Sequence, residues 1–462
     1  MEDTDKVSTE IFIRIRQDYG EIASSISPFG NIFAAFFHDL VVHFTGIIIH
    51  RNTVGDYEER VPFPWVNREY ALKPFQLGPA MFPRKNDSSG LKELVRSIGL
   101  VPVAAGQSIP VGSDSGLFTE KILKTLMPVS ENERVFIPEY DTQEDKLKHL
   151  VFQICHEYEI PNGSDIWKNW TQHLSLHTTR VQKSVSIRGA LLGTRNNLQN
   201  RKLALNFLQQ DKQVVGFTHG ELSNHVFDEP VYSYSDRTLC TTLIEYGDFS
   251  PEFISHPPII APEKEICRNS QLVQKYFSPS SAITPVNLAD ARVLLIPTIY
   301  QQNHLYGPKR SYETLKYYEW HKTLEACIPN LTVKVHPKTR FSPKFFQPTE
   351  SRPLEQCIPE YDLLVFDFIA SGVALALFSD KPVIYFDIGL RTINPQFKSE
   401  LEDRGPIYEI DFNQDWDAQV RQALDSLEKS NRTFSNLGLA KYSLTEKSEY
   451  GIGRTIFDIM YG

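Results

Sequence analysis

The stretch DLLVFDFIASGVALALFSDKPVIYFD, residues 362–387, decides how the fold of this chain is interpreted. Two short apolar runs, 362–367 and 381–387, stand on either side of a longer apolar segment that begins at Ser371 and Gly372. Short continuous apolar runs are typical of strands that are buried on both faces of a parallel sheet. The stretch therefore predicts strand, helix and strand, the unit of a doubly wound parallel sheet.

The same alternation precedes this stretch in the C-terminal third of the chain. ARVLLIPTIY (291–300) and LTVKV (331–335) predict strands. SYETLKYYEWHKTLEA (311–326) has helical periodicity and opens with Ser311, a candidate N-cap. PLEQCIPEY (353–361) predicts a short helix or turn. A Rossmann-like domain is the expectation for this third.

A second unit of the same kind lies in the middle of the chain. RGALLGT (188–194) and KQVVGFTHGE (212–221) predict strands, and NNLQNRKLALNFLQQD (196–211) predicts the helix between them. EDKLKHLVFQICHEY (144–158) predicts a further helix. The proline-rich segment 250–290 has little periodicity and is the expected linker.

With 462 residues, the chain is too long for one ordinary core. We expect an α/β protein with two Rossmann-like domains that face a central cleft. The predicted units are residues 1–270, residues 285–440 and a C-terminal helix over 441–462.

The overall composition argues against several classes of function. The net charge of −9 argues against nucleic acid as the main partner, because phosphate backbones select basic surfaces. The five cysteines lie far apart without a CxxC pair, which favours reduced thiols over disulfides or a zinc site. The N-terminus is acidic and polar, unlike a secretory signal, so we expect a cytoplasmic protein.

The most apolar run is NIFAAFFHDLVVHFTGIIIH, residues 31–50. A membrane span needs about 20 residues with few or no charges. This run contains His38, Asp39 and His43, and Gly46 interrupts it. We expect buried core elements here, with peripheral contact to a membrane surface as the alternative and a span as the least favoured reading.

Four predicted strand ends carry polar or glycine-rich groups, and parallel α/β sheets bind ligands at such ends. Ser371 and Gly372 begin a helix, where backbone N–H groups and the helix dipole attract an anion. An ordinary helix cap is the alternative. The other three ends are the loop from Tyr300 to Arg310, His336-Pro337-Lys338 and His219-Gly220-Glu221.

His336 and Pro337 close the strand 331–335, because proline cannot donate to a sheet ladder. His336 can donate to a phosphate or a carboxylate, or it can serve only to shape the turn. Lys338 and Arg340 are equally consistent with a binding role and with solvated surface cations.

The pattern VKVHPK (333–338) followed by residues 361–387 resembles the GT-B glycosyltransferases that build bacterial surface polysaccharides. It is most similar to capsule and lipopolysaccharide Kdo transferases, bacterial sialyltransferases and CDP-glycerol glycerophosphotransferases. The resemblance covers about residues 185–250 and 290–390. It implies a GT-B fold and a cytidine nucleotide held by a His-Pro motif and a downstream serine motif.

Carried over by resemblance, His336 and Pro337 match the His-Pro motif, and Ser371 matches one serine of the downstream motif. Ala370 stands where many relatives have another serine or threonine, a departure that bears on phosphate binding. Asp367 matches the acidic residue that commonly precedes this turn.

VVGFTHGE (214–221) resembles the strand-end His-Gly of polysaccharide transferases. An inverting transfer needs a general base, for which His219 or Glu221 is the candidate. A retaining transfer by double displacement needs a carboxylate nucleophile, for which Glu221 is the first choice. Nearby acidic residues, Asp228 and Glu229, are equally consistent with a solvated loop.

Asp236 and Arg237 are further site candidates that could equally form a structural ion pair. Nothing in the sequence resembles the DxD metal site of the other large glycosyltransferase class, so we expect no metal and no cofactor.

The leading hypothesis is a transferase that moves Kdo or a related acidic sugar from a CMP donor to a glycan or lipid-linked glycan. A UDP-sugar or CDP-glycerol donor, a non-catalytic nucleotide- or carbohydrate-binding protein and a two-domain epimerase are the alternatives.

Overall fold

The structure is a computed structural model of the chain. Two parallel sheets lie within the described part, inside the ranges 1–270 and 285–440 predicted as two α/β domains. The limits of those domains stay a prediction. The structure describes residues 14, 143–160, 163–168, 189–192, 204–205, 207–208, 211–217, 225–226, 236–245, 261–267, 283, 286–298, 300, 314–336, 348–429 and 459.

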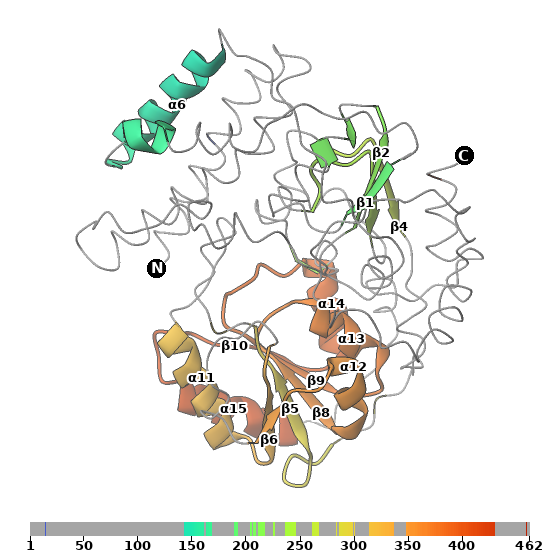
Figure 1. Ribbon diagram of the computed structural model, residues 1–462. Coiled ribbons are helices and arrows are strands. Elements are labelled where there is room, and N and C mark those ends of the chain that lie inside the picture. Colours follow the sequence, from blue (N-terminus) through green and yellow to red (C-terminus); the bar gives the residue numbers. More distant parts are fainter. Residues whose placement is uncertain are drawn as a thin grey trace.

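The C-terminal sheet has six strands, and all of its strand pairs are parallel (Figure 1). The strand order is β10-β9-β8-β5-β6-β7. Counted from β5, this is the 3-2-1-4-5-6 order of doubly wound nucleotide-binding sheets. The strands are β5 (Val293–Ile296), β6 (Leu331–Lys334), β7 (Thr349–Glu350), β8 (Leu363–Phe366), β9 (Val383–Asp387) and β10 (Ile407–Glu409).

Helices lie on both faces of this sheet (Figure 1). One face is covered by α11 (Thr314–Cys327) and α15 (Trp416–Lys429), which pack against each other. The other face carries α12 (Leu354–Cys357), α13 (Ser371–Phe378) and α14 (Pro395–Arg404), with the 3₁₀ turn η6 (Ile358–Glu360) after α12. The described C-terminal region is therefore a three-layer α/β unit.

Trp320 lies at the centre of the core between the sheet and the pair α11–α15, and it is fully buried. Its ring meets Phe386 edge-on at 5.7 Å between centroids and Phe412 at 5.6 Å. Truncating a buried tryptophan to alanine costs about 3–5 kcal/mol. Apolar packing alone therefore holds α11 firmly against the sheet.

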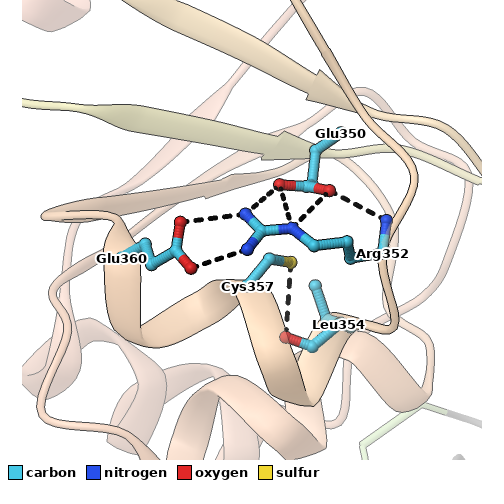
Figure 2. A network of polar contacts seen from close by, with 5 residues as sticks. All are labelled: Glu350, Arg352, Leu354, Cys357 and Glu360. Carbon is cyan, nitrogen blue, oxygen red and sulfur yellow. Dashed lines mark hydrogen bonds and ion pairs between the residues drawn. The ribbon is translucent and has the colours of Figure 1, made fainter.

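The short strand β7 is joined to η6 by Arg352 (Figure 2). Nη2 of Arg352 donates to Glu350 Oε2 at 2.6 Å, and Nη1 donates to Glu360 Oε1 at 2.6 Å. The Arg352 and Glu360 side chains are 45% and 55% exposed, whereas Glu350 is buried, so this network runs from the interior to the surface.

The second sheet has four described strands in the order β1-β2-β3-β4, and all its pairs are parallel. The strands are β1 (Gly189–Leu192), β2 (Gln213–Phe217), β3 (Thr242–Glu245) and β4 (Lys264–Cys267). The helix α6 (Gln143–Glu157) precedes them, as predicted.

The apolar runs that predicted strands are confirmed, and each strand is shorter than its run. The helix predicted at 196–211 is helical where it is described, at 204–205 and 207–208. Ser311 and nearly all of 441–462 lie outside the described residues. Helices α14 and α15 were not predicted, although Asn394 caps α14 by accepting the Gln396 N–H at 2.9 Å.

The prediction of a linker over 250–290 is wrong at residues 264–267. These residues form β4, which pairs with β3 from Thr242 beside Lys264 to Glu245 beside Cys267. The sequence KEIC has two charged residues and no apolar run, so it does not look like a buried strand. Strand pairing uses backbone groups, however, and does not require an apolar run. Short strands β7 and β10 escaped prediction because two or three residues show no periodicity.

His225 and Val226, which lie between β2 and β3 in the sequence, contact the segment that leads into α14. Val226 forms an isolated antiparallel bridge with Ile393, and the Asn394 N–H donates to the His225 carbonyl at 2.9 Å. The His225 ring meets Phe397 edge-on at 4.5 Å. A segment four residues after Glu221 is thus bound to the start of α14.

Among the described helices, none is both long enough and apolar enough to cross a membrane. The apolar run 31–50 lies outside the described residues.

Candidate functional site

The switch point of the six-stranded sheet lies between β5 and β8. These strands are neighbours, with Val293 beside Leu363 and Ile296 beside Phe366. The chain leaves β5 toward α11 on one face and leaves β8 toward α13 on the other. Ligands of such sheets bind beyond the carboxyl ends of the strands at this point.

Helix α13 begins at Ser371, five residues after β8 ends. Its N-cap residue is Ala370, which has extended backbone angles and makes no side-chain cap hydrogen bond. An alanine N-cap costs about 1 kcal/mol relative to serine or asparagine. The first turn of α13 therefore depends on other oxygen atoms for its N–H groups.

Gly372 packs closely against the end of the sheet. A Cβ atom at this position would lie 3.2 Å from Ile296 Cγ2 and 3.3 Å from Leu354 Cδ2. The glycine allows α13 to approach β5 and α12, which is a packing role. Its predicted contact with a phosphate stays a prediction, as does that of Ser371.

Asp367 directly follows β8 and is fully buried. The Tyr317 hydroxyl donates to Oδ1 at 2.9 Å, and Trp320 Nε1 donates to Oδ2 at 3.0 Å. His321 Nε2 lies 2.6 Å from the same Oδ2. All three partners belong to α11, so the carboxylate binds β8 to this helix rather than facing a ligand.

The hydrogen bonds continue from α11 to the segment after β5. The Tyr300 hydroxyl lies 2.6 Å from His321 Nδ1, and the Thr298 N–H donates to the Tyr317 hydroxyl at 3.1 Å. Burial, and then the charge of Asp367, raise the pKa of both tyrosines well above the ordinary value. The two hydroxyls therefore stay neutral and can donate.

We call Thr298, Tyr300, Tyr317, Trp320, His321 and Asp367 the switch-point network. Sequence reasoning proposed Tyr300 and Asp367 but missed the three residues of α11. Their spacing at positions i, i+3 and i+4 places them on one face of a helix. This spacing is visible in the sequence and could have identified them as a group.

His336 follows β6 by two residues and is half-buried. It lies at the same edge of the sheet, one strand away from β5. The preceding Lys334 is buried, its Nζ donates to the Val335 carbonyl at 3.1 Å, and burial lowers its pKa. Pro337 and Lys338 lie outside the described residues.

The end of β9 adds two residues that the sequence did not single out. Burial raises the pKa of Asp387, the last residue of β9. Arg391 is buried, and its guanidinium lies 4.3 Å from the centroid of the Phe368 ring. Asp387 could have been found from the sequence, because it ends an apolar run that predicts a strand. Arg391 could not, because its position depends on the turn after β9.

Beside the other sheet, Arg237 pairs with Glu245 at the end of β3. The distance from Nη2 to Oε1 is 3.0 Å, and both side chains are buried. Asp236 is buried as well. The predicted catalytic residues His219 and Glu221 lie outside the described residues, in the segment that follows β2.

Within the described residues, no group of three or more histidine, cysteine, aspartate or glutamate side chains could hold a metal ion. Comparison with known proteins finds no match to any family model, curated protein or solved structure. The geometry of the site is thus the basis for any proposal about function.

Proposed function

We propose that the chain is a glycosyltransferase of GT-B architecture, with two domains that face a cleft and a nucleotide-activated sugar as donor. The observation that supports this proposal is the strand order of the six-stranded sheet, with α13 beginning beside its switch point. Sheets with this order bind nucleotides beyond their strand ends, and helix N-termini bind phosphate groups.

In this proposal the donor's phosphate lies at the first turn of α13. Ala370 supplies no side-chain oxygen to this turn, so phosphate oxygens can accept from its N–H groups. His336, which follows the carboxyl end of β6 in the same sheet, is the second hydrogen-bond donor to the phosphate. Pro337, Lys338 and Ser371 belong to the site through the resemblance to nucleotide-binding transferases.

The chemistry is assigned to the other domain. In an inverting transfer, the acceptor oxygen attacks the anomeric carbon, its proton goes to His219 or Glu221, and the bond to the phosphate oxygen breaks. The nucleotide leaves with the electron pair. In a double displacement, a Glu221 oxygen attacks the anomeric carbon and the nucleotide leaves with the electron pair of the broken bond to the phosphate oxygen. The acceptor oxygen then attacks the same carbon, loses its proton to His219, and releases the Glu221 carboxylate.

A CMP-activated acidic sugar such as Kdo is the proposed donor, and a surface glycan or lipid-linked glycan is the proposed acceptor, in the cytoplasm. Peripheral contact with a membrane through residues 31–50 belongs to the same proposal. A UDP-sugar or CDP-glycerol donor, or nucleotide binding without catalysis, is the alternative.

Calorimetric titration of the full chain with CMP, CDP and UDP tests the nucleotide site. We expect CMP to bind most tightly, and His336→Ala to weaken binding at least about tenfold because it removes a hydrogen bond to a charged phosphate. His156→Ala, which changes an exposed histidine on α6, is the matched control and leaves affinity unchanged. Tighter binding of UDP contradicts the cytidine donor, and no binding of any nucleotide contradicts the whole proposal.

A transfer assay with the purified chain tests the catalytic residues. We expect His219→Ala and Glu221→Gln to abolish transfer while nucleotide affinity stays at the wild-type value. Unchanged turnover contradicts these assignments. Nucleotide binding without transfer from any activated sugar favours the non-catalytic alternative.

A further inference from the structure

We infer that the switch-point network is a positioning device: it holds the segment after β5 and the segment after β8 at a fixed separation, through α11. None of its members is proposed to touch the ligand. The functional consequence, a dependence of nucleotide affinity on this network, rests on the proposed function.

The network begins with a charge whose burial is costly. A carboxylate removed from water loses several kcal/mol of hydration unless hydrogen bonds compensate. Asp367 is fully buried and receives hydrogen bonds from Tyr317, Trp320 and His321. Apolar side chains already fix α11 to the sheet through Trp320, so adhesion of the helix does not require this charge.

The three donors fix the orientation of both partners. One oxygen of Asp367 accepts from Tyr317, and the other accepts from Trp320 and His321. With three partners on its two oxygen atoms, the carboxylate has one favoured orientation. The same contacts favour one orientation of α11 about its axis. The start of the turn that leads to α13 is thereby fixed relative to α11.

The same helix residues hold the other strand end. Tyr317 accepts from the Thr298 N–H while it donates to Asp367. An ionised carboxylate has no proton to donate, so with Asp367 ionised the proton of the contact between Oδ2 and His321 Nε2 belongs to the histidine. A neutral imidazole that donates through Nε2 accepts the Tyr300 hydroxyl at Nδ1.

The result is a continuous chain of hydrogen bonds between the two ends that form the switch point. It runs from residues 298 and 300, after β5, through two side chains of α11 to residue 367, after β8. A ligand at this point lies between these segments. A small change in the separation of the two segments therefore changes the affinity for a ligand that must contact both of them.

Two conservative variants of the full chain test the inference without a ligand. Tyr300→Phe removes the bond to His321, and Tyr317→Phe removes the bonds to Thr298 and Asp367. Tyr385→Phe is the matched control, because its buried hydroxyl has no hydrogen-bond partner within the described structure. Hydrogen–deuterium exchange is measured in peptides that cover residues 292–300 and 363–373.

In Tyr317→Phe, we expect amide exchange to accelerate at least about threefold in both peptides. In Tyr300→Phe, we expect the same acceleration in the peptide 292–300 only. Tyr385→Phe should exchange at the wild-type rate. Exchange that stays at the wild-type rate in both variants overturns the inference, and so does acceleration spread evenly over the whole chain, which indicates loss of stability alone.

Nucleotide titration of the same three variants separates this inference from the proposed function. We expect Tyr317→Phe to weaken nucleotide binding about three- to tenfold and Tyr385→Phe to leave it unchanged. A wild-type chain that binds no nucleotide contradicts the proposed function, while the exchange measurement still decides the positioning role. Unchanged affinity in Tyr317→Phe, with a wild-type chain that binds, overturns the functional consequence.

Discussion

Two polar networks beside the six-stranded sheet both bind carboxylates and differ in their exposure to water. The switch-point network centres on Asp367, which is fully buried. The network in Figure 2 centres on Arg352, whose side chain is 45% exposed between Glu350 and Glu360. Groups that lose a partner at the surface are rehydrated, whereas buried groups stay unsatisfied. The number of hydrogen bonds is therefore a poor guide to the stability that each network contributes.

The largest effect is expected from Asp367→Asn. The amide nitrogen of asparagine cannot accept a hydrogen bond, so it would face one or more of the donors on α11. We expect the free energy of unfolding to fall by about 2–4 kcal/mol, measured by urea denaturation. Asp425→Asn, at an exposed position on α15, is the matched control. Equal losses in the two variants would show that the buried network is no more important than the surface.

A smaller effect is expected from Glu350→Gln, at the buried end of the Arg352 network. Hydrogen bonds from Arg352 lower the pKa of Glu350 to about 2, from a usual 4.5. A lowered folded-state pKa stabilises the protein above the unfolded-state value, and this stabilisation is lost as the pH falls from 4.5 toward 2. Because Arg352 is partly exposed, we expect a loss of about 1 kcal/mol at neutral pH.

The measurement for Glu350→Gln is urea denaturation at several pH values. The difference between the variant and the wild type should shrink through the acid range and vanish near the folded-state pKa. A difference that is independent of pH would mean that the glutamate acts through packing rather than through its charge.

An effect about as large as that of Glu350→Gln is expected from Arg352→Met, which keeps the long side chain and removes the charge that binds Glu350 and Glu360. We expect the thermal unfolding midpoint to fall slightly, and the fall to shrink in about 1 M salt, where charges are screened over about 3 Å. The effect of Asp367→Asn should not change with salt. Equal salt dependence in both variants would remove the distinction between the two networks.

Much of the fold could be predicted from the sequence because buried parallel strands are apolar runs. Residues 362–387 predicted β8, α13 and β9 correctly. The same reasoning missed β3, β4, β7 and β10, which have two to four residues each. The predicted linker over 250–290 overlaps β4, because a proline-rich sequence with little periodicity does not look like a strand.

The candidate site was predictable only in part. Strand-end reasoning selected Asp367 and Tyr300, and the structure brings both into one network. It treated Asp236 and Arg237 as a candidate pair, whereas Arg237 pairs with Glu245. A strand end identifies which edge of the sheet a residue occupies, but it does not say whether the side chain faces a ligand or a neighbouring helix.

Local sequence patterns predicted the alternation of strands and helices and the residues that close the strands, because hydrophobic runs, glycine and proline act locally. The partners of Asp367, by contrast, depend on tertiary packing. Its partners lie 46 to 50 positions away in the chain and meet it only when α11 packs on the sheet beside β8. A hydrogen bond requires atoms within about 3 Å, and no local pattern sets that distance between remote segments.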